Sequence, residues 1–286
     1  MFNKAPSITI TDEEFRLIRE FIRDHSGIYF DDDSKKMLEK RLNRRLLAHN
    51  IYSFRDYYRY LLYDSKRDEE ISAIMDILTV NETYFFREKN QLKAFKEEIL
   101  PELKERNMKR KRLKILSAGC STGEEPYTIG ILIKESGLFH DWDVEIIGSD
   151  INRRVLTVAR QGIYGQHSFR GTEKYYINKY FDPVDDGRYR IKDEIKKLVF
   201  FSNLNLIESD KLAFLGPVDT IFCRNVLIYF DIPSRKKVID GFYRILKYGG
   251  YLLLGHAESL INISTDFILK HLRNDLVYQK PLKGEH

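Results

Sequence analysis

The spacing of hydrophobic residues changes character near residue 111. Before that point apolar residues recur three or four positions apart, as on one face of a helix, and strand-like alternation is missing. Thr11 and Glu14 form a capping box ahead of the first helical stretch, and Gly27 can end it. Further helices are predicted over about 34–50, 54–61, 69–80 and 88–107. The first part of the chain is therefore expected to be a small all-helical unit.

From residue 113 short apolar runs alternate with helical segments. Strands are predicted over 113–119, 144–150, 218–225, 251–256 and 276–281, with helices over 126–135, 152–160 and 233–246. Strands separated by such helices indicate a mostly parallel sheet with helices on both faces. The stretch 163–200 is rich in Tyr, Phe, Lys and Gly and interrupts the pattern. It is predicted to be an inserted lobe with short strands at 189–191 and 198–201.

Composition narrows the class of protein. The chain has 286 residues, of which 43% are hydrophobic, enough for one or two domains with a sizeable core. Two cysteines exclude a disulfide scaffold and a cysteine-rich zinc site, and the histidines show no metal-ligand spacing. With no apolar run approaching 18 residues and no apolar signal core, we expect a cytoplasmic protein without a metal or membrane insertion.

The loop after the first predicted strand reads SAGCSTGEEP, over 117–126. Its glycines, Gly119 and Gly123, lack the G-x-G-x-x-G spacing, and no GK[ST] follows, so a P-loop is excluded. Glu124 and Glu125 would repel a pyrophosphate, whereas Asp150, which ends the second strand, can bind ribose hydroxyls. Together these residues favour a nucleoside without phosphates, and S-adenosylmethionine is the obvious candidate.

Two other motifs can be structural or functional. Residues 81–88 read NETYFFRE, either a helix cap with an aromatic anchor or a lid that closes over a cofactor. Residues 222–231 read FCRNVLIYFD, which puts Arg224 and Asn225 at the carboxyl edge of the sheet, where ligands bind in open α/β folds. Tyr229 is either a core aromatic or a π-face for a sulfonium.

Basic residues gather in two places. The helix predicted over 34–50 has an apolar stripe of Leu38, Leu42 and Leu46 opposite a cationic face, which is either solvated or docks on an acidic surface. The cations of this helix include Lys36, Lys40, Arg41, Arg44 and Arg45. The tract RNMKRKRLK, over 106–114, is either a solvated connector or a nucleic-acid patch.

The motif set NETYFFRE, SAGCSTGEEPYTI, GSD, FCRNVLIYFD and GGYLLLGHAESL resembles the chemotaxis receptor methyltransferases, the CheR family. The resemblance implies an N-terminal helical domain over 1–88, a connecting helix over 89–110, and a Rossmann-like class I methyltransferase domain over 111–286 with a β-subdomain insertion at about 163–200. It implies methyl transfer from S-adenosylmethionine to glutamate side chains on chemoreceptor cytoplasmic helices, which form glutamyl methyl esters for sensory adaptation and leave S-adenosylhomocysteine.

The resemblance also assigns roles to residues. Arg87 and Tyr229 are the expected catalytic positions, at the acceptor or cofactor and at the sulfonium, respectively. The expected cofactor-binding residues are Asn81, Thr83, Arg87, Gly119, Glu125, Asp150, Asn205, Leu206, Arg224 and Asn225. The pair Asn205-Leu206 has a competitor, because Asn203-Leu204 repeats the dipeptide. The helix over 34–50 resembles the family's receptor-docking helix, and whether residues 163–200 bind a receptor's C-terminal pentapeptide stays open.

Two alternatives come from other classes of protein. The tract 106–114 would suit a nucleic-acid methyltransferase, but no motif is committed to a flipped base, so this reading is disfavoured. A non-catalytic S-adenosylmethionine-binding regulator would be expected to lack Arg87 or Tyr229, and both are present.

Overall fold

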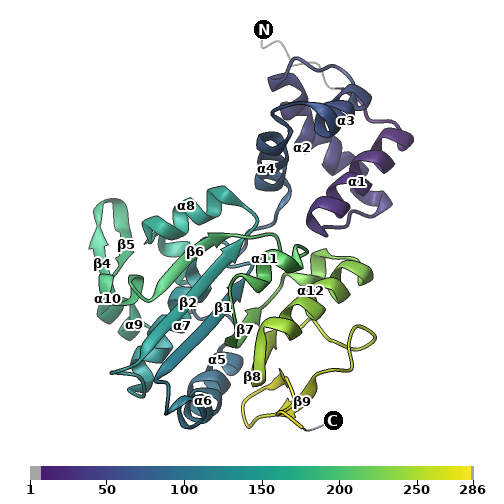
Figure 1. Ribbon diagram of the computed structural model, residues 1–286. Coiled ribbons are helices and arrows are strands. Elements are labelled where there is room, and N and C mark those ends of the chain that lie inside the picture. The colour runs from purple at the N-terminus through teal and green to yellow at the C-terminus, as the bar shows by residue number, and fades with distance from the viewer. Residues whose placement is uncertain (1–7, 285–286) are drawn as a thin grey trace. The chain divides into compact units, whose positions relative to one another are not determined.

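The computed structural model describes residues 8–284, which form two compact units (Figure 1). Among the described residues, the first unit comprises 8–80 and Tyr229–Ser234, and the second comprises Asn81–Ile228 and 235–284. Each unit has its own architecture and is described separately.

The first unit is helical. Its helices are α1 Asp12–Ser26, α2 Lys35–Ala48, α3 Phe54–Tyr63 and α4 Arg67–Leu78, with a 3-10 turn at Asp32–Ser34. The capping box is confirmed: the Thr11 hydroxyl accepts from the Glu14 N–H at 3.2 Å, and the Glu14 carboxylate accepts from the Thr11 N–H at 2.9 Å. Gly27 ends α1 in the left-handed conformation, with φ at 77°, as predicted.

The second unit is built on a seven-stranded sheet. Its strands are β1 Arg112–Ala118, β2 Asp143–Asp150, β6 Val199–Asn203, β7 Val218–Cys223, β8 Leu246–Leu254, β9 Ile268–His271 and β10 Leu276–Gln279. Their order is β6-β2-β1-β7-β8-β10-β9, parallel through β8 and antiparallel beyond it. The chain winds outward from β1 through β2 to β6, then returns to β7 on the other side of β1. The β1/β7 boundary is thus the switch point where ligands bind in such folds.

Helices cover both faces of this sheet, as predicted (Figure 1). Their bounds are α5 Lys89–Ala94, α6 Leu100–Asn107, α7 Glu124–Ser136, α8 Arg153–Gln161, α11 Ser209–Ala213 and α12 Ile232–Ile245. A π-helical turn at Phe95–Ile99 joins α5 to α6, so the predicted long polar helix is one continuous element.

A small three-stranded sheet forms the insertion. Its strands β3 Ile163–Tyr164, β4 Phe181–Val184 and β5 Arg188–Ile191 lie in the order β3-β5-β4. Short helices α9 Lys174–Tyr180 and α10 Asp193–Lys196 and 3-10 turns at Gln166–Phe169 and Asp185–Gly187 complete it. The assignment of a strand at 198–201 to the inserted lobe is wrong. That strand is β6, which pairs in parallel with β2 at the edge of the main sheet, so Phe200 remains 58% exposed.

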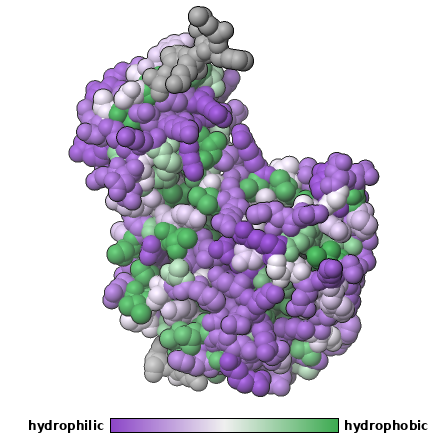
Figure 2. All heavy atoms as spheres, turned by 180° about the vertical axis from the view of Figure 1, so that it is seen from behind, coloured by the Kyte–Doolittle hydropathy of each residue, from purple (hydrophilic) through white to green (hydrophobic). Residues whose placement is uncertain are grey.

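The face shown in Figure 2 is mostly hydrophilic, with hydrophobic residues in small groups. Some of the exposed apolar side chains lie on the antiparallel edge, including Ile268, Leu269 and Leu276. Within residues 8–284 no helix combines the length and apolarity needed to cross a bilayer.

Candidate functional site

The turn after β1 approaches the loop after β7 very closely. The N–H groups of Gly119 and Cys120 donate to the Ser149 carbonyl oxygen at 2.8 and 2.9 Å, which ties the turn to β2. Gly119 has φ at 74°, and a Cβ placed on it would lie 2.3 Å from Cγ2 of Val226. Only glycine satisfies both the backbone conformation and the close approach.

Asp150 organises this turn from the end of β2. The side chain is buried, and its oxygens accept from the N–H groups of Ser121 at 2.8 Å and Asn152 at 2.9 Å. The Ser121 hydroxyl then donates to the Asn81 carbonyl oxygen at 3.2 Å. The structure therefore brings Gly119, Asp150 and Asn81 together at the carboxyl edge of the sheet.

Arg224 lies at the centre of a buried ionic network. Its side chain is only 3% exposed and pairs with Glu125 at 3.2 Å and Glu88 at 3.1 Å. Ser117 donates to the other oxygen of Glu125 at 2.7 Å. Burial raises the pKa of Glu125, and the Arg224 charge opposes the rise. These contacts join the end of residues 81–88 to the strand ends, a bracing role that sequence reasoning missed for Glu88.

Residues 81–88 are anchored by two aromatic side chains. Phe85 is buried, and Phe86 stacks on Tyr176 with ring centroids 4.4 Å apart. The rings that surround Phe85 within 5.2 Å are Tyr164, Phe169 and Phe181. Thr83 and Arg87 are half-buried, and the Arg87 guanidinium donates to the Glu82 carbonyl oxygen at 3.0 Å. The aromatic anchor is thus confirmed, whereas the helix cap is not, because α5 begins after Glu88, whose side chain makes no capping hydrogen bond. The lid stays a prediction.

Glu258 holds the loop after β7. Its Oε2 accepts from the N–H groups of Asn225 and Gly255, both at 2.8 Å, and its Oε1 accepts from those of Val226 at 2.9 Å and Ile228 at 3.3 Å. This carboxylate fixes Asn225 at a φ of 59°. Asn225 Oδ1 is buried without a hydrogen-bond partner among the described residues. Sequence reasoning missed Glu258, although an acid shortly after a strand end was the available signal.

The two Asn-Leu dipeptides have different surroundings. Asn203 Nδ2 donates to the carbonyl oxygens of Asp150 and Ile151, both at 2.9 Å, so this amide closes the turn after β2. Asn205 and Leu206 follow in the loop after β6, where Leu206 is buried. Asn205-Leu206 therefore remains the pair proposed for the adenine.

Glu124, the neighbour of Glu125, points to the inserted lobe. It accepts hydrogen bonds from the hydroxyls of Thr122 at 2.6 Å and Ser168 at 2.9 Å, and burial raises its pKa. Glu124 is thus engaged by the inserted lobe, and the choice of Glu125 over Glu124 for the cofactor stays a prediction.

Tyr229 belongs to the first unit. It ends the 3-10 turn Leu227–Tyr229, and its carbonyl oxygen accepts from the Tyr29 N–H at 2.9 Å. Its role beside the sulfonium stays a prediction.

The cations of α2 fall into two groups. Arg45 is engaged by the buried Glu70, with Nε 2.9 Å from Oε1, and Arg41 donates to the carbonyl oxygens of Ile77 and Leu78 at 3.3 and 2.9 Å. The remaining three are exposed along one side of the helix and form what we call the α2 stripe: Lys36, Lys40 and Arg44. Of the predicted docking residues, these three are exposed and have no ion pair with another residue within 8–284.

Among residues 8–284, no group of three or more His, Cys, Asp or Glu side chains is arranged to hold a metal ion.

The parallel sheet, its switch point and the acid at the end of β2 are those of a Rossmann-like fold that binds a nucleoside. Residues 13–79 match the family description "CheR methyltransferase, all-alpha domain", and residues 81–275 match "CheR methyltransferase, SAM binding domain". The chain belongs to the CheR methyltransferase family and is an S-adenosylmethionine-dependent methyltransferase.

Curated relatives share nearly the whole length. "Chemotaxis protein methyltransferase 2" of Vibrio cholerae is 40% identical over 279 residues, 97% of this chain and 96% of that protein. "Chemotaxis protein methyltransferase" of Borreliella burgdorferi is 36% identical over 259 residues, 89% and 90% of the two chains. A solved O-methyltransferase family protein from Burkholderia thailandensis aligns with a TM-score of 0.42 at 11% identity, over 80% of this chain and 63% of that chain. A likeness that low carries no argument about function.

Proposed function

We propose that this protein transfers methyl groups from S-adenosylmethionine to glutamate side chains on the cytoplasmic helices of a chemoreceptor. The observation that carries the proposal is the 40% identity, over 97% of the chain, to a chemotaxis protein methyltransferase. We place the protein in the cytoplasm, where those receptor helices would be reached.

The residues at the sheet edge fit a nucleoside. Asp150 has the position of an acid that binds ribose hydroxyls, and Asn225 has a buried side-chain oxygen with no partner in the described chain. A buried polar atom of this kind ordinarily finds a hydrogen-bond donor, which a bound ligand can supply. We assign Asn81, Thr83, Gly119, Asn205 and Leu206 to the same pocket.

Arg224 and Glu125 have an indirect role in this proposal. Glu125 and Arg224 form a buried ion pair, and Arg224 also pairs with Glu88. Through Glu88 they position the segment 81–88 and its Arg87. They act as positioning residues, whereas Asp150 and Asn225 are assigned direct contacts.

The chemistry requires positioning more than proton transfer. When bound, S-adenosylmethionine supplies an electrophilic methyl group on its sulfonium. A glutamate side chain has a reference pKa of about 4.3, so the acceptor is already a carboxylate nucleophile at neutral pH. Holding two reactants in line can supply about 7–11 kcal/mol of the barrier. The work of the protein is therefore to orient the acceptor and exclude water.

Arg87 is the residue we assign to the acceptor carboxylate. Its guanidinium is half-buried, and its hydrogen bond to the Glu82 carbonyl oxygen leaves most of its donors available. A hydrogen bond to a charged group contributes about 1.5–3 kcal/mol, so Arg87→Ala should slow methyl transfer about 10- to 150-fold. Arg87→Lys is the matched variant and should recover part of the rate. Unchanged turnover in Arg87→Ala, with an unchanged Tm, would remove Arg87 from the mechanism.

The α2 stripe is the surface we assign to the receptor. Three exposed cations on one side of a helix complement an acidic helical bundle, and such charges raise association rates and fix orientation.

The test of the proposed function is transfer of labelled methyl to chemoreceptor cytoplasmic fragments, followed by alkali. Labelled methanol released by base would establish carboxyl methyl esters. Label that survives alkali would place the methyl on nitrogen or carbon instead, and would refute glutamate esterification.

A further inference from the structure

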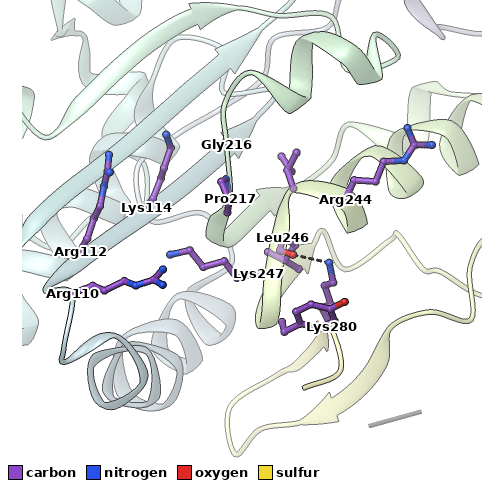
Figure 3. A pocket seen from close by; sticks show the side chains of 11 residues that line it. Arg110, Arg112, Lys114, Gly216, Pro217, Arg244, Leu246, Lys247 and Lys280 are labelled. Atoms are coloured by element: carbon purple, nitrogen blue, oxygen red, sulfur yellow. Dashed lines mark hydrogen bonds between the residues drawn. The ribbon is translucent and has the colours of Figure 1, made fainter. Parts of the chain in front are cut away.

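A concave site lies at the amino ends of the parallel strands, opposite to the candidate cofactor site. It has a volume of about 680 Å³ and opens where β1, β7 and β8 begin. Its walls come from the segment before β1, the turn Gly216–Pro217, the end of α12 and the residue after β10 (Figure 3). A volume of this size falls within the range of small-molecule sites in proteins.

The lining of this cavity carries only one sign of charge. The basic lining residues are Arg110, Arg112, Lys114, Arg244, Lys247 and Lys280, and none of the acidic residues within 8–284 lines the cavity. Three carboxylates outside the lining pair with some of these cations. Asp143 and Glu145 pair with Arg112 at 3.2 and 2.9 Å, and Glu145 also pairs with Lys114 at 3.0 Å. Asp219 pairs with Lys247 at 2.8 Å. Six cations against three carboxylates leave an excess of three positive charges.

The unpaired charges are the informative ones. Within residues 8–284, Arg110 and Arg244 have no carboxylate partner. The Lys280 ammonium donates to the carbonyl oxygens of Tyr243 and Leu246 at 2.7 and 2.8 Å, so its charge is also uncompensated. Figure 3 shows the tips of Arg110 and Lys247 turned toward each other, whereas Arg244 points away along α12. Lys247 is compensated by Asp219, so Arg110 is the member of this facing pair whose charge an added anion would balance.

This cavity is separate from the methyltransferase site. The cavity opens at Arg112, where β1 starts. The turn with Gly119, which we assign to the cofactor, follows Ala118 at the other end of the same strand. At about 3.3 Å per residue that places the two sites about 20 Å apart. A sulfonium would also be repelled by the excess positive charge.

We propose that this cavity binds an oligophosphate: a small molecule with two or three linked phosphates, such as a nucleoside triphosphate. Arginine matches phosphate oxygens with paired hydrogen bonds, and the net positive lining, in which Arg110 is exposed and uncompensated, suits a short phosphate chain. Pro217 and the half-exposed ring of Tyr248 add an apolar wall on which a base can lie. The size of the site favours a small molecule over a nucleic acid. Arg110, Arg112 and Lys114 in its lining give part of the basic tract 106–114 a specific role.

The experiment is calorimetric titration of the full chain with two probes, inorganic tripolyphosphate and ATP. Arg110→Gln is the diagnostic variant because Arg110 is exposed and unpaired, so its loss leaves no buried carboxylate alone. We expect the Kd for both probes to rise at least tenfold in Arg110→Gln and to rise further in Arg110→Glu. We also expect binding to weaken as the salt concentration increases. Arg190→Gln, on the exposed side of β5, is the matched control and should keep the parent Kd.

Each outcome decides the proposal. Equal binding of both probes supports recognition of the phosphate chain, and tighter binding of ATP supports an added contact to the base. Failure of both probes to bind, or equal binding by Arg110→Gln and the parent, would overturn the proposal. Binding of duplex DNA while both oligophosphates fail would overturn it in favour of a nucleic-acid surface. S-adenosylmethionine affinity serves as the separate readout and should not change in Arg110→Gln.

Discussion

Replacement of Glu258 tests how the loop after β7, which we assign to the cofactor site, is held in place. Each of its two carboxylate oxygens accepts from two backbone N–H groups, in the loop after β7 and at Gly255. In Glu258→Gln one of these oxygens becomes an amide NH₂, which cannot accept. Whichever oxygen is replaced, two of the four hydrogen bonds are lost and donors face donors.

The size of the effect follows from those two bonds. A hydrogen bond to a charged group contributes about 1.5–3 kcal/mol, so the loss is about 3 kcal/mol if the loop partly relaxes. For a domain of this size, 1 kcal/mol shifts Tm by about 2–4 °C, which predicts a Tm lower by about 6–12 °C. The Asn225 backbone, held at a φ of 59°, would lose its restraint, and S-adenosylmethionine should bind at least tenfold more weakly.

Thermal unfolding and calorimetric titration with S-adenosylmethionine measure the two effects. Glu194→Gln is the matched control, because it removes the same charge from an exposed position in α10. A Glu258→Gln variant whose Tm and Kd both equal those of the control would refute the restraint that we assign to this carboxylate.

Three further predictions concern other parts of the molecule. Charge reversal across the α2 stripe should lower kcat/KM for receptor fragments at least tenfold at low salt and leave the S-adenosylmethionine Kd unchanged; a shift in Kd alone would contradict a docking role. Glu70 is buried, and although burial alone would raise its pKa, hydrogen bonds from Arg45, Tyr57 and His49 lower it. Its stabilising effect is therefore complete above the unfolded pKa of about 4.3 and is lost as pH falls through the folded value. Glu70→Gln should cost about 3–5 kcal/mol at pH 7 and weaken the acid dependence of unfolding, as followed by circular dichroism; an unaltered pH profile would count against this. Gly119→Ala should reduce Tm and cofactor affinity because of the contact with Val226, whereas Gly171→Ala, at the same φ of 74° but in open space, isolates the backbone cost; equal effects in both would deny the close approach.

The elements that could be predicted from the sequence are those whose buried residues form a recognisable run or repeat along the chain. β1 and β7 are short apolar runs with nearly continuous burial, which makes their pattern easy to recognise. β9 was missed because it lies at the antiparallel edge, where most of its residues stay exposed. β6 was assigned to the insertion because an edge strand of mixed exposure resembles the short strands before it.

The candidate site shows the same division. Asp150 and Gly119 stand at strand ends, so their places followed from the strand prediction. The contacts that hold the site rigid join distant residues: Arg224 and Glu88 are 136 positions apart, and Asn225 and Glu258 are 33 apart. No local spacing reveals such pairs, because they exist only once the sheet has brought the segments together. The cavity at the amino ends of the strands was hidden for the same reason.

The measurement that tests the central claim most directly is mass spectrometry of a chemoreceptor cytoplasmic fragment after incubation with the protein and S-adenosylmethionine. The account predicts that particular glutamate side chains gain one methyl group, that the gain is reversed by base, and that it is strongly reduced with Arg87→Ala. Methyl groups found on other residue types, or no methylation of the fragment despite measured cofactor binding, would contradict it.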